Sequence, residues 1–178
     1  MVVSAMVLAI MLLYVAFLSF RPGLLPTQPG ELRRVYIVND WWGWGPNRQI
    51  RFTLAPEGGD FAGEAFFAEV RDATVIWSST HELRLPAGVM ENFLFVLSQA
   101  PLVEGEYDPG IDLSGDYPSR RIELETARGK VVIHSEAQGE GGAPWAAEIG
   151  GRGYVIHADV PMRALNVLAP HLVRPASE

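Results

Sequence analysis

Two histidines in the second half of the chain have matching surroundings, VVIHSE and YVIHAD. Each ends an apolar run, and a carboxylate follows two positions later on the same face of a strand. On neighbouring strands they would form a ligand set for Zn²⁺ or Mn²⁺, comprising His134, Glu136, His157 and Asp159. The simpler interpretation is that each polar residue lies where a strand meets water, and a further predicted strand at 145–149 can separate the two.

The segment EGEYDPGIDLSGDYP is a second candidate for metal binding. Carboxylates on a connection rich in proline and glycine can surround a hard cation such as Ca²⁺, although their spacing differs from that of an EF-hand. The candidate ligands are Asp108, Asp112 and Asp116, with Glu104 and Glu106 nearby. The simpler interpretation is a solvated connection whose aspartates stabilise turns, so we expect neither a metal nor a cofactor.

Three of the five tryptophans lie within the short segment NDWWGWGP. Its glycines and proline disfavour regular pairing, so we expect a loop between the first two strands. At least one ring should cap the core while another stays exposed, and clusters of exposed aromatic side chains mark interaction sites. The candidate binding residues are Trp41, Trp42, Trp44, Asn39 and Asp40. Contact with a protein partner or lipid is favoured, and a glycan platform is the alternative.

Other catalytic patterns are missing from the sequence. No serine lies in a G-x-S-x-G motif, and GEGGAPW lacks the lysine of a phosphate-binding loop. The chain has no cysteine, which excludes disulfides and thiolate chemistry. Its net charge of −7 argues against a nucleic-acid partner. These features favour a non-enzymatic protein.

The elements that position these residues follow from the hydrophobic periodicity. The pattern predicts four strands and a helix, then four more strands and a second helix. The strands are expected at 32–38, 49–55, 61–70, 73–85, 121–126, 130–136, 145–149 and 153–158, and the helices at 86–99 and 160–172. The fold class is therefore α+β: an N-terminal transmembrane helix, then a two-layer domain. In that domain about eight antiparallel strands, divisible into two β4α halves, are covered on one face by two helices.

The first twenty residues contain no charged side chain. A helix of that length spans ~30 Å, the thickness of the hydrocarbon core of a bilayer. The run lacks the basic start and small-residue cleavage site of a signal peptide, so we expect an uncleaved anchor. Residues 21–31, rich in proline and glycine, are expected to form a tether, 32–174 the α+β domain and 175–178 a disordered tail.

Two opposing arguments bear on which side of the membrane the domain occupies. Arg21, Arg33 and Arg34 follow the anchor, and the positive-inside rule alone would place the domain in the cytoplasm. Small domains behind an N-terminal anchor are more often exported, and Arg33 and Arg34 belong to the first strand. An extracytoplasmic domain is therefore favoured, with the cytoplasmic alternative kept open.

The segment GEYDPGIDLSGDYPSRRIEL, residues 105–124, and the later Pro144-Trp145 pair resemble an uncharacterised family of bacterial membrane-anchored proteins. The resemblance implies no activity and no catalytic residue. With the anchor, it indicates a single-pass membrane protein that binds a protein partner or the membrane surface. The alternatives are an envelope domain that binds a small ligand or a glycan and, less favoured, a metal-dependent hydrolase using His134 and His157.

The uncharged run generates a first prediction. The full-length chain should sediment with membranes and resist carbonate extraction, because a spanning helix is held by the bilayer core. A chain beginning near Thr27 should stay soluble. A soluble full-length product whose N-terminus lies near residue 21 would contradict the anchor.

Overall fold

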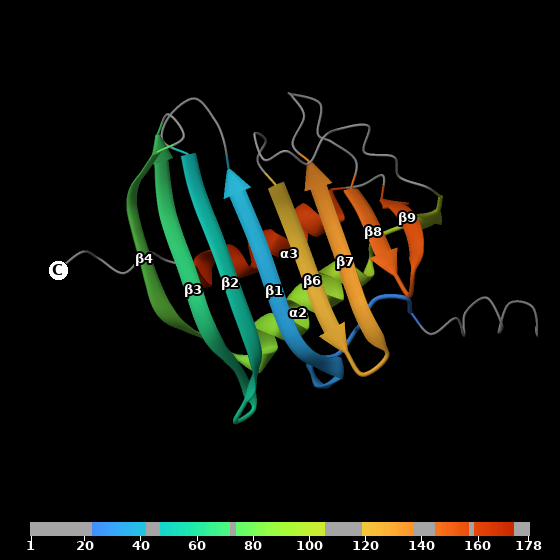
Figure 1. Cartoon of the computed structure of the whole chain (residues 1–178). Helices are drawn as coiled ribbons and strands as arrows, with labels where there is room; N and C mark the ends of the chain where they lie inside the picture. Colours follow the sequence, from blue (N-terminus) through green and yellow to red (C-terminus); the bar gives the residue numbers. More distant parts are fainter. Residues whose placement is uncertain are drawn as a thin grey trace, which may run out of the picture.

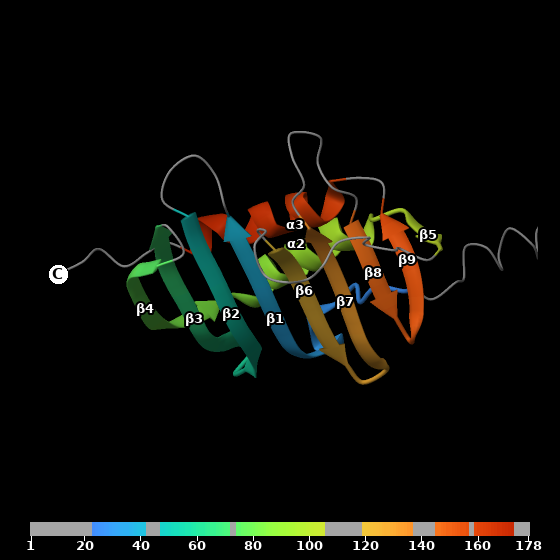
Figure 2. The same ribbon diagram turned by 45° about the horizontal axis from the view of Figure 1, so that its top comes forward.

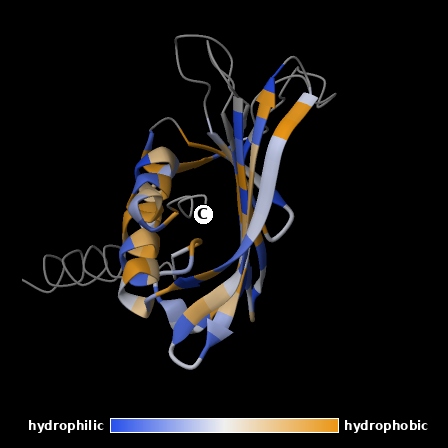
Figure 3. Cartoon of the chain, turned by 90° about the vertical axis from the view of Figure 1, so that its left-hand side faces the viewer, coloured by the Kyte–Doolittle hydropathy of each residue, from blue (hydrophilic) through white to orange (hydrophobic). Residues whose placement is uncertain are grey.

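The computed structural model describes residues 23–41, 47–71, 74–105, 119–136, 145–156 and 159–172, with residues 40, 41, 47, 119 and 136 described by their backbone alone. A nine-stranded antiparallel sheet forms one layer. Two α-helices lie next to each other against one of its faces (Figures 1 and 3). The α+β class predicted from the sequence is confirmed.

The elements follow the predicted order, with short additions. They are η1 (Pro29–Glu31), β1 (Leu32–Trp41), β2 (Asn47–Glu57), β3 (Asp60–Arg71), β4 (Thr74–Leu85), α2 (Ala87–Ser98), β5 (Leu102–Glu104), β6 (Ser119–Thr126), β7 (Gly129–Glu136), β8 (Trp145–Ile149), β9 (Arg152–Ile156), α3 (Val160–Leu168) and η2 (Ala169–His171). The sheet has nine strands rather than about eight, because the three residues of β5 pair with β9 at the far edge (Figure 2).

The strand order is β4-β3-β2-β1-β6-β7-β8-β9-β5. Each run of four consecutive strands is a meander, and the two runs join where β1 pairs with β6. Tight turns close the hairpins. Gly58 and Gly59 have φ values of 60° and 91°, a backbone conformation that glycine adopts without steric cost.

The core lies between the sheet and the helices. Alternate residues of the central strands face the helices, and register places Ile37 beside Phe52 on one side and Ile122 on the other. From α2 the buried side chains are Met90, Phe93, Leu94 and Leu97, and from α3 they include Ala164, Leu165 and Leu168. Both helices therefore pack an apolar face against the sheet.

The second helix begins without a side-chain cap. Asp159 occupies the N-cap position of α3, but its side chain makes no capping hydrogen bond. Its carboxylate instead lies 3.6 Å from the guanidinium of Arg163, one turn further along. The helix begins with buried Val160 and Pro161, so packing and the fixed φ of proline specify its start.

Gly63 marks a close approach between β2 and β3. A Cβ atom built at this position would lie 1.9 Å from the backbone oxygen of Thr53. Any side chain would therefore push the two strands apart beside the buried Leu54, which pairs with Gly63. Glycine at this position therefore permits the close approach of the two backbones.

The segment expected to be a free tether lies partly against the domain. Leu25 is only 3% exposed and belongs to the hydrophobic core. Residues 21–24 alone thus separate the predicted anchor from the core, and a soluble chain should begin at Gly23 rather than Thr27. None of the helices in the described ranges is both long and apolar enough to cross a membrane. The predicted anchor, residues 1–20, lies outside those ranges.

Two phenylalanines of α2 provide a matched test of the two-layer core. Phe93 is fully buried, whereas Phe95 is 62% exposed. Phe93→Ala should lower the free energy of unfolding by about 3–5 kcal/mol, because it leaves a cavity under the helix. Phe95→Ala should change it by less than about 0.5 kcal/mol. Chemical denaturation of the chain beginning at Gly23 measures both, and equal effects would contradict the helix orientation.

Candidate functional site

One end of the sheet, where β1 ends and β2 begins, gathers charged and aromatic residues on the face toward the helices. Arg48 of β2 pairs in register with Glu69 of β3, and Glu69 pairs with Trp77 of β4. These three residues lie one row beyond Ile50 and Phe67, the last apolar row of the core on these strands. Strand alternation therefore directs all of them toward the same side as the helices.

A cavity of about 180 Å³ lies at this corner of the fold. Ile50, Phe67, Trp77 and Leu172, which follows η2, form its apolar walls. Arg48 and Glu69 also line it, as do Gln49 and Ala68. Apolar cavities of about 150 Å³ accept benzene, so a group of that size fits here. A charge of each sign lies beside the apolar walls.

The two charges face each other without forming an ion pair. Residues opposite each other on antiparallel strands have Cβ atoms about 4.5–5.5 Å apart, which favours pairing of opposite charges. Yet among the described residues no ion pair or hydrogen bond involves Arg48 or Glu69, although several other pairs form, such as Arg34 with Glu125. Both groups can therefore interact with a ligand.

A serine and a histidine lie further along the same face of β4. His81 Nε2 lies 2.7 Å from the hydroxyl of Ser79, and its ring is tilted against that of Phe67 with centroids 6.1 Å apart. A hydrolytic triad would need a carboxylate to orient the histidine. No carboxylate in the described part of the chain hydrogen-bonds to His81. The pair is better explained as two polar groups that satisfy each other on an edge strand.

The two predicted histidine strands are not neighbours. β8 lies between β7, which carries His134, and β9. His134 is half-buried on the face away from the helices, opposite Arg121 and Ala146, while Asp159 lies at the N-cap position of α3. His157 and the side chain of Glu136 lie outside the described residues. Within the described ranges no three His, Asp or Glu residues gather where they could hold a metal.

Most of the predicted acidic ligands also lie outside the described residues, namely Glu106, Asp108, Asp112 and Asp116. Glu104 is described, at the end of β5. Its carboxylate lies 3.8 Å from the guanidinium of Arg152 on the adjacent strand. This exposed ion pair joins two strands at the edge of the sheet, which is a structural role.

The predicted tryptophan site lies partly in strand β1. Asn39, Asp40 and Trp41 continue this strand, and Trp41 pairs with Arg48 of the cavity row. Asn39 is half-buried between Ile50 and Arg120. The side chains of Asp40 and Trp41 lie outside the described part, as do Trp42 and Trp44. The loop expected between the first two strands therefore begins after Trp41.

Arg120 is a functional candidate that the sequence reasoning missed. It faces the helices from β6, in the same row as Asn39 and Ser135. Its Nε is buried and, within the described residues, has no hydrogen-bond partner. Burial lowers the pKa of this guanidinium below its ordinary value. Alternation could have revealed it, since Arg120 shares its face with the core residues Ile122 and Leu124.

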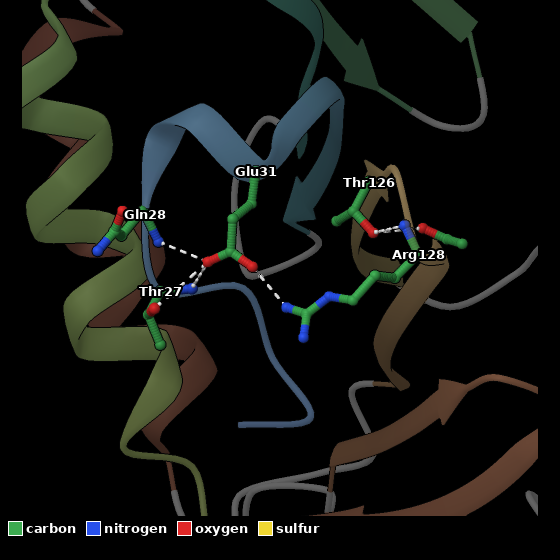
Figure 4. Close-up of polar contacts among 6 residues, drawn as sticks. Thr27, Gln28, Glu31, Thr126 and Arg128 are labelled. Atoms are coloured by element: carbon green, nitrogen blue, oxygen red, sulfur yellow. Dashed lines mark hydrogen bonds and ion pairs between the residues drawn. The ribbon is translucent and has the colours of Figure 1, made fainter. Parts of the chain in front are cut away.

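Two carboxylates elsewhere form compact polar clusters. Glu31 accepts hydrogen bonds from the backbone N–H groups of Thr27 and Gln28, at 2.9 and 3.1 Å, and from the guanidinium of Arg128 (Figure 4). The bond from Thr27 is the largest influence, and together these contacts lower the pKa of Glu31. The cluster fastens the N-terminal segment to the β6–β7 turn.

Glu123 lies on the face of the sheet away from the helices, between Arg121 and Lys130. Burial raises the pKa of this carboxyl, but the hydrogen bonds and charges of its two basic neighbours outweigh burial and leave the pKa below its ordinary value. The cluster ties β6 to β7, and its carboxylate is already paired with two basic side chains.

Comparison with protein-family models, with curated proteins and with solved structures finds no match to this chain. The resemblance of residues 105–124 to a family of membrane-anchored proteins stays an observation about the sequence. Function is therefore inferred from the geometry of the described residues.

The Glu31 cluster makes stability depend on pH. Its lowered pKa stabilises the fold at neutral pH, and this contribution is lost as pH falls below about 4.5, through the pKa of the folded state. Glu31→Gln should cost about 1 kcal/mol at pH 7 and little at pH 3, as charged hydrogen bonds to a partly exposed group are lost. Glu91→Gln, at an exposed position of α2, is the control. Urea unfolding across this pH range measures both, and a constant cost of Glu31→Gln would contradict the assignment.

Proposed function

We propose that this chain is a membrane-anchored, non-enzymatic domain that binds a protein partner by adding a strand of that partner to β4. The anchor is the uncharged run 1–20, and the domain would lie on the extracytoplasmic side. The observation that carries the proposal is that no strand in the described part of the chain pairs with the outer side of β4. Strand addition uses the free backbone groups of such an edge, so it needs no catalytic constellation.

β4 is a long, outermost strand of twelve residues without proline or glycine. Its charged residues lie in the second half, where Arg84 pairs with Glu57 and Asp60 at 3.0 and 3.4 Å. The first half, residues 74–80, carries no charge and exposes Val75 and Ile76, at 54% and 49%. Long, uncharged edges are templates for another strand.

The other edge of the sheet has the opposite character. β5 has only three residues, ends in a charged residue, and stands between Pro101 and Gly105. Natural proteins protect their edges with short strands, charges and prolines. The contrast supports a specific role for β4, because the β5 edge is protected, whereas no described strand covers the outer side of β4.

The spacing of the chain favours a protein partner over the lipid surface. Residues 21–24 span at most ~13 Å between the predicted anchor and the docked Leu25. β1 then carries the chain for ten residues, ~33 Å, before the tryptophan-rich loop. That loop begins at the end of the sheet remote from the attachment point (Figure 1). This weakens the expectation that the tryptophan-rich segment contacts lipid.

The test is photo-crosslinking of the full-length chain in its own membranes. A photoreactive amino acid at Ile76 should give a discrete protein adduct, and the same group at Val103 on the protected edge should give none. Adding Val75→Lys should abolish the adduct at Ile76, because a charge disfavours strand pairing, while leaving stability within about 0.5 kcal/mol.

The products separate the possible occupants. An adduct of twice the chain mass would identify a second copy as the partner. Adducts with lipid alone would favour the membrane surface instead. Equal labelling from Ile76 and Val103, or an adduct insensitive to Val75→Lys, would overturn strand addition at β4.

A further inference from the structure

We propose that the cavity between β2, β3, β4 and Leu172 binds a small zwitterion, an α-amino acid whose side chain is apolar and about the size of a benzene ring. The apolar walls would take the side chain, Arg48 the carboxylate and Glu69 the ammonium group. The site lies on the helix-facing side of the sheet, so it does not depend on the strand addition proposed for the edge of β4.

The apolar part of the ligand follows from the walls and the volume. Phe67 and Trp77 present aromatic surface, while Ile50 and Leu172 present aliphatic surface, all packed against the core. About 180 Å³ accommodates one benzene-sized group, whereas sites for drug-sized ligands occupy about 300–1,000 Å³. A phenylalanine or leucine side chain fits, and a sugar or a nucleotide is too large and too polar.

The polar part follows from the two charges. Arg48 is exposed and can offer its planar fork of donors to a carboxylate, which binds both oxygens at once. Glu69 is half-buried and can accept hydrogen bonds from an ammonium group. Register places the two residues directly opposite each other, so the groups they bind must be close neighbours in the ligand. An ammonium and a carboxylate on one carbon atom meet this requirement.

The arrangement also discriminates against singly charged ligands. A carboxylate alone would place its charge beside Glu69, and an amine alone would lie beside Arg48. Like charges in a partly desolvated site weaken binding. The main competitor is a direct contact between Arg48 and Glu69, which the described residues do not form. Such a contact would close the mouth of the cavity to charged groups.

The experiment is calorimetric titration of the detergent-solubilised full-length chain with L-phenylalanine, N-acetyl-L-phenylalanine and L-phenylalanine amide. The first should bind at least about tenfold more tightly than either capped form, because each cap removes one charge. In Arg48→Gln, phenylalanine amide should bind as tightly as free phenylalanine, because the residue that recognises the carboxylate is gone. In Glu69→Gln, the N-acetyl form should bind as tightly as free phenylalanine, because the residue that recognises the amine is gone. Arg152→Gln and Glu148→Gln, at the opposite side of the sheet, should leave all three affinities unchanged.

Thermal unfolding provides a second readout on the same samples. Saturating phenylalanine should raise the melting temperature of the parent chain and of both control variants, but not of the double variant Arg48→Gln/Glu69→Gln. Equal binding of the three compounds would leave only an apolar cavity and overturn the zwitterion site. Tight binding of the amide form with no binding of free phenylalanine would identify a peptide N-terminus instead. No saturable binding of any compound at about 10 mM would reject the site.

Discussion

The antiparallel pairing of β1 with β6 is the interaction on which the rest of the structure depends. It joins two four-stranded meanders into one sheet and places Ile37 beside Ile122 at the centre of the core. Because the first strand of each run is used in this junction, only later strands can lie at an edge. In the first run the edge is β4, and in the second run β5 covers β9. The open edge is thus a consequence of the topology.

Through this junction, the same alternation of inward-facing and outward-facing side chains continues across the whole sheet. A shift of one residue in any pairing would turn every following side chain to the opposite face. Apolar residues occupy successive rows under the helices. At the end where β1 finishes, Arg120 enters the row of Asn39 and Ile50, and Arg48 and Glu69 lie in the next row. Charged residues in an inward row are unfavourable for folding unless they meet water or a ligand. We therefore expect binding at the end of the sheet where these two rows lie.

The sequence predicted most of this fold, since strand alternation and helix periodicity are local signals that survive in the structure. It missed β5, because three residues are too short to show a period. It also missed the pairing of Arg48 with Glu69, which depends on register between strands rather than on any motif. The inward orientation of Arg120 could have been predicted, because Arg120 shares its face of β6 with the core residue Ile122. The metal site predicted around His134 required the strands of His134 and His157 to be neighbours, but β8 lies between β7 and β9.

Strand β4 contributes to both proposed sites, through its backbone edge in one case and through a side chain in the other. Its backbone edge points away from the sheet, while Trp77 points inward and forms a wall of the cavity. A strand added to the edge would therefore extend the surface beside the cavity without filling it. The N-terminal segment is fastened at the other end of the sheet, where Glu31 meets Arg128 of the β6–β7 turn. About ten residues of β1, ~33 Å, lie between this attachment and the charged row. The cavity and residues 74–80 of β4 therefore lie toward the opposite end of the sheet from this attachment.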